Sequence, residues 1–163
     1  MNIVLTGMPA SGKTSVAKEL EKLGKTVCDT DAEIVNRHGS ISSIFKNHGE
    51  EYFRNLETAE VKRLSQKHGV VIATGGGCIM RQENVKLLRA SGKIVYLRTG
   101  LETLYNRAKG NTSRPLLSGD THEKLKKLYD ERTPVYERNA DIIIDTDGLK
   151  PEEIARKITE LIQ

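Results

Sequence analysis

The chain of 163 residues has the length of one domain of ordinary size, and its 37% hydrophobic residues can fill one core. Its net charge of +4 comes from 26 basic and 22 acidic side chains that are mixed along the sequence, a pattern that argues against a nucleic-acid surface. No apolar run approaches the roughly 18 residues of a membrane span, and no signal-peptide pattern opens the chain. We therefore expect a single cytoplasmic domain over residues 1–163 that binds neither nucleic acid nor membrane.

The spacing of cysteine and histidine does not form a metal-binding motif. Cys28 and Cys78 lie far apart without a CxxC pair, so we expect both to be small, reduced packing residues. Three of the four histidines precede a glycine, at His38-Gly39, His48-Gly49 and His68-Gly69. A glycine after the last turn and a basic residue in it are typical of a helix C-terminus, so this pattern predicts three helix ends.

Five short apolar runs alternate with helical segments along the chain. Continuous apolarity predicts strands that are buried on both faces, as in a parallel sheet covered by helices. The expected fold is therefore a three-layer α/β/α domain with a five-stranded parallel sheet, whose functional groups gather at the carboxyl ends of the strands. The predicted strands cover residues 2–6, 26–29, 70–74, 93–98 and 141–145.

Directly after the first predicted strand, residues 7–14 read GMPASGKT. This spacing predicts a loop whose backbone N–H groups surround a phosphate, while Lys13 supplies a point charge and Thr14 a hydroxyl for Mg²⁺. A helix is predicted from Thr14 to Gly24, and the positive end of its dipole would favour a bound polyphosphate. The predicted nucleotide-binding residues of this segment are Gly7, Pro9, Ala10, Ser11, Gly12, Lys13, Thr14 and Ser15.

Two carboxylates, Asp29 and Asp31, follow the second predicted strand. If the extended conformation persists, alternate residues point the same way, so both carboxylates can face Lys13. One can then hold a metal-bound water, while the other orients the hydroxyl of a second substrate or receives its proton. The alternative is that Asp31 caps a helix that begins at Ala32.

Residues 49–68 read as one longer helix, in which Arg54 and Glu57 share a face. Glu57 can hold the guanidinium of Arg54 in one orientation for a substrate carboxylate, although an ordinary surface ion pair is the other interpretation.

Three consecutive glycines, Gly75, Gly76 and Gly77, follow the third predicted strand. Because such a run is unfavourable in backbone entropy, it indicates that another group approaches this backbone closely, with a tight turn as the alternative. This strand has no terminal aspartate for Mg²⁺, which assigns that role to Asp29.

Residues 107–120 are rich in Gly, Asn, Ser and Pro and carry Arg107, Lys109 and Arg114. This composition is typical of a mobile lid that closes over phosphates, and a plain basic loop is the alternative. A helix is predicted from Glu123 to Tyr136, with a break or kink at Pro134 that could turn Arg132 inward. The last predicted helix, over residues 151–163, is amphipathic, and we expect it only to pack against the core without a role in the site.

Together these motifs resemble the shikimate kinase family over nearly the whole chain. The motifs are GMPASGKT, DTD at 29–31, GEEYFR at 49–54, TGGG at 74–77, RPLL at 114–117 and ERTPVY at 131–136. The resemblance implies a fold of the nucleoside-monophosphate-kinase type, substrate-binding helices within about residues 31–68, and a lid at about 107–120. It also implies transfer of the γ-phosphoryl group of ATP to the 3-hydroxyl of shikimate, with Mg²⁺, by what we expect to be a monomer.

On the nucleotide side, the resemblance implies that Lys13 contacts the β and γ phosphates, that Thr14 ligates Mg²⁺, and that Asp29 supports the metal through water. It places Arg107 against adenine, and Arg114 reaches the phosphates from the lid.

On the acceptor side, the resemblance implies that Asp31 binds the ring hydroxyls and accepts the proton. Arg54 and Arg132 would pair with the shikimate carboxylate, and Gly75 to Gly77 would line the ring. Lys13, Asp31 and Arg114 are thus the implied catalytic residues. The chain departs from the family pattern at Ala10, where glycine is common, and at Arg138, where many relatives carry an acid.

Two other functions remain open from the residues. The chain could phosphorylate another small acceptor, such as gluconate or a nucleoside monophosphate, although Arg54 and Arg132 favour a carboxylate. It could also be a regulatory module that binds nucleotide without transferring phosphate, but the presence of Asp29, Asp31, Lys13 and Arg114 argues against this.

Overall fold

The computed structural model describes residues 1–109 and 121–163. The strands of the described residues are β1 (Asn2–Thr6), β2 (Thr26–Asp29), β3 (Val70–Ala73), β4 (Gly92–Arg98) and β5 (Ile142–Asp145). The helices are α1 (Lys13–Lys22), α2 (Thr30–His38), α3 (Ile41–His48), α4 (Glu50–Ser65), α5 (Gln82–Ser91), α6 (Leu101–Lys109), α7 (Thr121–Asn139) and α8 (Pro151–Ile162), with a 3-10 turn η1 (Cys78–Met80).

The five strands of the described chain form one parallel sheet in the order β2-β3-β1-β4-β5. The central strand β1 pairs with β3 and with β4, so that Val4 lies opposite Ile72 on one side and Ile94 on the other. This confirms the predicted fold class and all five predicted strands, with shifts of one residue at some ends. Because every strand is parallel, their carboxyl ends meet at one edge of the sheet.

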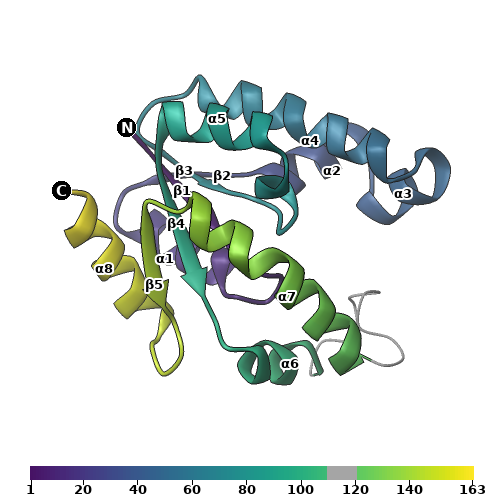
Figure 1. Ribbon diagram of the computed structural model, residues 1–163. Coiled ribbons are helices and arrows are strands. Elements are labelled where there is room, and N and C mark those ends of the chain that lie inside the picture. Colours follow the sequence, from purple (N-terminus) through teal and green to yellow (C-terminus); the bar gives the residue numbers. More distant parts are fainter. Residues whose placement is uncertain (110–120) are drawn as a thin grey trace.

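Helices cover both faces of the sheet, and Figure 1 shows α4 and α5 on one side and α1 and α8 on the other. The alternation of β1 explains the two cores, because successive side chains of a strand point to opposite faces. Ile3 and Leu5 pack with Leu20 of α1 and Ile158 of α8, whereas Val4 belongs to the core under α4, α5 and α7.

At the edge of the sheet, β5 differs from the prediction of complete burial. Ile143 is 40% exposed, whereas Ile144 is buried against the α1 and α8 core. An edge strand has a neighbour on one side only, and in β5 one face is left partly uncovered. The run of three isoleucines therefore marks a strand, but not one that is buried on both faces.

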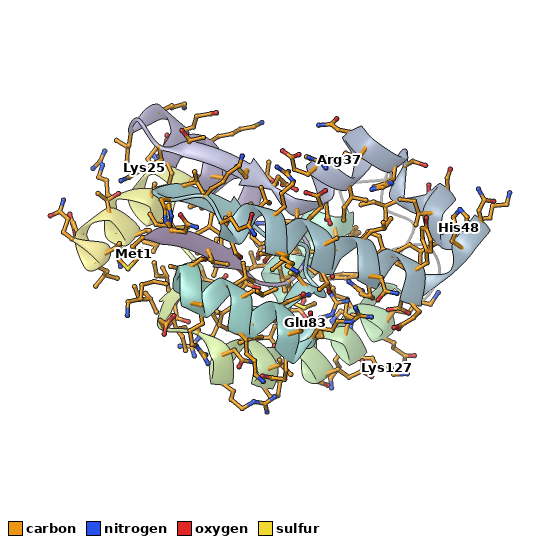
Figure 2. The ribbon with its side chains drawn as sticks, turned by 90° about the horizontal axis from the view of Figure 1, so that it is seen from above. Met1, Lys25, Arg37, His48, Glu83 and Lys127 are labelled. Atoms are coloured by element: carbon orange, nitrogen blue, oxygen red, sulfur yellow. The ribbon has the colours of Figure 1, made fainter. Side chains whose placement is uncertain are left out.

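The helices α2 and α3, together with the first half of α4, form a small unit beside the sheet. Ile34, Ile44 and Phe53 make its small core, and the rings of Phe45 and Phe53 lie 5.0 Å apart. His48, at the end of α3, lies at the opposite end of the molecule from Met1 (Figure 2). Because α2 starts directly at the end of β2, this unit stands next to the carboxyl ends of the strands.

Two of the three predicted His-Gly helix ends are confirmed. Gly39 and Gly49 follow α2 and α3 with φ of 88° and 85°, conformations that glycine adopts readily. The third is wrong, since α4 ends at Ser65 and His68-Gly69 lies beyond it. The N–H of Lys67 bonds to the carbonyl of Leu64, a tighter i to i−3 pattern that ends the helix early.

Of the break or kink predicted at Pro134, the break does not occur, because α7 runs through this residue to Asn139, and Arg132 nevertheless faces Gly76. Pro134 and Asp130 are both exposed, so the carbonyl of Asp130, which has no N–H donor at position 134, lies on the solvent side.

Among the helices of residues 1–109 and 121–163, none combines the length and the apolar character that a membrane span requires.

Candidate active site

A cavity of about 550 Å³ opens at the carboxyl ends of the strands. Five segments that are distant in the sequence line it: the loop after β1, the junction of β2 and α2, the loop after β3, the end of α6, and the chain after β5. The lining residues include Pro9 to Val16, Asp29, Asp31, Ala73 to Gly76, Arg107 and Ala108. The structure therefore brings most of the predicted site residues together around one space.

The chain after β5 also lines this cavity, through Leu149, Pro151 and Ile154. The sequence reading of the last helix as packing only is therefore wrong. Pro151 is the first residue of α8, where a residue without an N–H fits a helix start. The available signal was its place after a strand end, because every strand of a parallel sheet delivers its loop to the same edge.

The loop after β1 has the backbone of a phosphate-binding loop. Gly7 and Gly12 have φ of 150° and 96°, values that L side chains rarely adopt. Helix α1 begins at Lys13 without a side-chain cap or an acidic residue in its first turn, which leaves its N-terminal N–H groups for an anion. The ammonium of Lys13 donates to the carbonyls of Gly7 and Met8 at 2.7 and 2.9 Å.

Asp29, and not Asp31, caps helix α2. The Asp29 side chain accepts a hydrogen bond from the N–H of Ala32 at 3.0 Å, and its φ and ψ are extended. Helix α2 starts at Thr30, so the expected extended run to Asp31 does not occur. Both carboxylates nevertheless line the cavity, because Asp31 lies in the first turn of the helix that Asp29 caps.

The three glycines after β3 leave room for side chains that lie close to their backbone, and they are not required by a positive φ. None of them is among the residues with positive φ in the described chain. A Cβ added to Gly75 would lie 2.8 Å from Oδ1 of Asp31, and one on Gly76 would lie 2.8 Å from Nη1 of Arg132. A Cβ on Gly77 would lie 2.6 Å from both terminal nitrogens of Arg54.

Each glycine thus supports a different side chain of the predicted acceptor site. Gly75 lies under Asp31, Gly76 under Arg132 and Gly77 under Arg54. The predicted close approach is made by the protein's own side chains. Arg54 and Arg132 come from α4 and α7, so the glycine backbone is the surface on which two separate helices place their guanidinium groups.

Arg54 is held by Glu57, one turn further along α4. Nη1 of Arg54 donates to Oε1 of Glu57 at 3.0 Å, and the Glu57 side chain is only 1% exposed. Burial raises the pKa of the Glu57 carboxyl, while the guanidinium of Arg54 opposes this shift and nearby Asp31 adds to it. Arg54 and Glu57 therefore form a half-buried ion pair, and not the ordinary surface pair that was the other interpretation of the sequence.

Arg107 lies in the last turn of α6 and reaches the phosphate loop. Its Nη1 donates to the carbonyl of Ala10 at 3.0 Å. The predicted start of the irregular segment at residue 107 is wrong, because residues 107–109 belong to α6. The rest of the predicted lid, with Arg114, lies outside the described residues.

Both cysteines are buried and unpaired, in agreement with the prediction of packing residues. Cys78 follows the glycine loop, and burial raises the pKa of its thiol well above the ordinary value. Asn84 donates to the carbonyl of Cys78 at 2.9 Å and fixes the start of η1.

A phosphate loop between the central strand and α1 of this parallel sheet, which shares one cavity with the carboxylates of Asp29 and Asp31, defines a P-loop kinase. The profile of the family described as "Shikimate kinase" matches residues 9–163. The chain belongs to the shikimate kinase family.

Individual relatives agree with this assignment over nearly their whole lengths. The shikimate kinase of Caldicellulosiruptor bescii is 44% identical over 163 residues, which cover 98% of this chain and 94% of the relative. That of Thermodesulfovibrio yellowstonii is 45% identical over 160 residues, covering 96% and 92%. The solved shikimate kinase of Acinetobacter baumannii in complex with shikimate superposes with a TM-score of 0.92 at 37% identity, covering 99% of this chain and 92% of that one.

Proposed function

We propose that the protein transfers the γ-phosphoryl group of ATP to the 3-hydroxyl of shikimate, giving shikimate 3-phosphate and ADP. The observation that carries this proposal is the glycine loop, where Asp31, Arg132 and Arg54 lie against three consecutive residues next to the phosphate loop. Membership of the shikimate kinase family and the relative solved with shikimate support the same acceptor.

On the nucleotide side, the phosphate loop and the N-terminus of α1 bind the phosphates of ATP. Lys13 exchanges its bonds to the carbonyls of Gly7 and Met8 for contacts with the β and γ phosphates, since an ammonium gains more from an anion than from a neutral carbonyl. Arg107 contributes a planar cation for contact with adenine. Arg114, outside the described residues, is proposed to reach the transferring group from the lid.

The donor set fits a magnesium ion. The Thr14 hydroxyl and the Asp29 carboxylate line the same cavity, and Mg²⁺ prefers such oxygen ligands together with water and substrate phosphates. When bound, the ion neutralises charge on the β and γ phosphates. Asp29 keeps one oxygen engaged with the N–H of Ala32, which orients the carboxylate before any ion arrives.

On the acceptor side, Arg54 and Arg132 pair with the shikimate carboxylate, and two directional guanidinium groups select it over a neutral sugar. Asp31 accepts a hydrogen bond from the reacting hydroxyl and orients it toward the γ phosphate. In a loose transition state the hydroxyl proton leaves late, so Asp31 acts mainly by orientation and as the final proton acceptor.

The test is ADP release from Mg-ATP by the purified protein with shikimate, gluconate, AMP or no acceptor. We expect ADP release only in the presence of shikimate. Equal release in all four reactions would overturn the proposal and favour a nucleotide-binding module, and release with gluconate or AMP alone would assign a different acceptor.

A further inference from the structure

We propose that Tyr136 is a positioning residue for the acceptor, because its buried hydroxyl fixes the backbone of Gly76 on which the acceptor-binding arginine Arg132 rests. This inference rests on the proposed function and extends it to a residue that does not touch the substrate.

The central observation is one hydrogen bond between segments that are 60 residues apart in the chain. The hydroxyl of Tyr136 donates to the carbonyl of Gly76 at 2.6 Å, and the Tyr136 side chain is completely buried. Burial raises the pKa of this phenol, so it remains a proton donor throughout the neutral range. The bond is therefore short, comes from a buried donor and is independent of ordinary changes in pH.

The carbonyl of Gly76 is a sensitive place for such an anchor. A peptide unit is planar, so fixing this carbonyl also fixes the direction of the N–H of Gly77. A glycine carries no side chain that could hold the loop by packing, and glycine backbone is the most easily rotated. Since Gly75 and Gly77 lie under Asp31 and Arg54, a rotation at Gly76 would disturb the support of the whole acceptor site.

The anchor also links Arg132 to its support. Arg132 and Tyr136 are one turn apart on α7, so they lie on the same face of this helix. A Cβ on Gly76 would lie 2.8 Å from Nη1 of Arg132, which puts the guanidinium directly over the residue that Tyr136 holds. Helix α7 therefore fixes the loop and the guanidinium above it together.

A second ring keeps Tyr136 in place from the sheet side. The rings of Tyr96, in β4, and Tyr136 stack with their centroids 5.0 Å apart and an interplanar angle of 30°. Both side chains are buried, with exposures of 1% and 0%. Burial also raises the pKa of the Tyr96 hydroxyl, which lies beside Thr133. Tyr96 therefore offers a matched control, a buried phenol in the same stack whose hydroxyl faces α7 and not the loop.

The experiment compares the Tyr136→Phe and Tyr96→Phe variants with the wild type. In Tyr136→Phe the loss of the hydroxyl, which bonds to the Gly76 carbonyl and also interacts with the Arg132 side chain, should raise the KM for shikimate about tenfold, with kcat and the KM for ATP within about twofold of wild type. Tyr96→Phe should keep all three constants. Because the chain contains no tryptophan, shikimate affinity without ATP is measured by titration calorimetry, and it should weaken by the same factor in Tyr136→Phe alone.

The outcomes separate this inference from the proposed function. A wild type that releases no ADP with shikimate overturns both. A wild type with shikimate-dependent turnover, together with an unchanged shikimate KM and affinity in Tyr136→Phe, overturns the positioning role alone. An equal rise of the KM for ATP and for shikimate in Tyr136→Phe also overturns it, because a merely structural role would affect both substrates.

Discussion

Arg54 and Glu57 form a half-buried ion pair at 3.0 Å across one turn of α4, with the carboxylate almost completely removed from solvent. The pair lies against Gly77, where a Cβ would lie 2.6 Å from the guanidinium. Burying a carboxylate is unfavourable unless a partner satisfies it, so Arg54 stabilises the charge of Glu57 while Glu57 restricts the rotation of Arg54. The guanidinium is thus oriented before an acceptor binds.

Glu57→Gln should weaken acceptor binding without affecting the nucleotide. The amide can still accept one hydrogen bond from Arg54 but loses the charge, so we expect the KM for shikimate to rise about tenfold with the KM for ATP unchanged. Steady-state kinetics with each substrate varied in turn measures this. The control is Glu51→Gln, in the same helix, whose carboxylate is 83% exposed and should leave both constants unchanged. Equal constants for wild type and Glu57→Gln would contradict the orienting role.

The same carboxylate predicts a pH dependence of stability. Burial raises the pKa of Glu57 above its ordinary value of 4.5, so the native state binds this proton more tightly than the unfolded chain does. The contribution of Glu57 to the free energy of unfolding is therefore fully present below pH 4.5 and decreases as pH rises through the raised pKa. Urea unfolding measures the free energy of unfolding of wild type and of Glu57→Gln from pH 4.5 to neutral pH. The value for the wild type minus the value for Glu57→Gln should decrease as pH rises. A difference that does not vary with pH would refute the raised pKa.

Asp31→Asn tests the group assigned to the acceptor hydroxyl. The variant keeps the size and place of the side chain but loses the charge that orients the hydroxyl and receives its proton. We expect kcat to fall by at least about 10²-fold, with ATP binding little changed. Glu33→Gln, in the same helix but bonded to Arg63 away from the cavity, should keep normal turnover. Near-normal turnover of Asp31→Asn would remove Asp31 from the proposed mechanism.

The nucleotide half of the site could be predicted from the sequence because it is local. The phosphate loop is one contiguous segment, and the positive φ of Gly7 and Gly12 follows directly from their places in the motif. The sequence offered a helix cap at Asp31 only as an alternative and did not indicate the cap at Asp29, since the choice depends on whether α2 starts at Thr30 or later. Helix starts are set by the hydrogen bonds of the first turn, and two nearby carboxylates both suit them.

The acceptor half depends on contacts that no local pattern contains. The sequence indicated that something approaches Gly75 to Gly77, but the groups that do so come from α2, α4 and α7. The contribution of Pro151 was missed for the same reason, since only the sheet order brings the loop after β5 to the cavity. Tyr136 belonged to a recognised motif, yet its bond to Gly76 links positions 60 residues apart.

Gly76→Ala should damage acceptor binding by displacing Arg132. The new methyl group would lie 2.8 Å from Nη1 of Arg132 and 3.1 Å from Cδ of Pro9, and the flexible guanidinium is the group that can move. If the guanidinium of Arg132 moves by up to about one ångström, we expect the KM for shikimate to rise by about 10- to 100-fold. The control is Gly24→Ala, where no atom lies within 4 Å of the new Cβ but φ is +88°. Gly24→Ala should lower the free energy of unfolding and keep the KM, whereas an unchanged KM in Gly76→Ala would contradict the predicted clash.

Ala10→Gly should stabilise the protein, because Ala10 is the non-glycine residue of the described chain with positive φ, at 68°. The left-handed conformation costs an L residue about 1–2 kcal/mol, and glycine loses about 0.4–1 kcal/mol through the greater freedom of the unfolded chain. The difference predicts a gain of about 0.5 kcal/mol in the free energy of unfolding, measured by urea denaturation.

The control is Ala59→Gly, at an exposed position inside α4, whose free energy of unfolding should instead fall by about 1 kcal/mol. Because Arg107 bonds to the carbonyl of residue 10 and not to its side chain, the KM for ATP should stay near the wild-type value. A loss of stability in Ala10→Gly as large as that in Ala59→Gly would mean that the left-handed backbone at position 10 carries no strain.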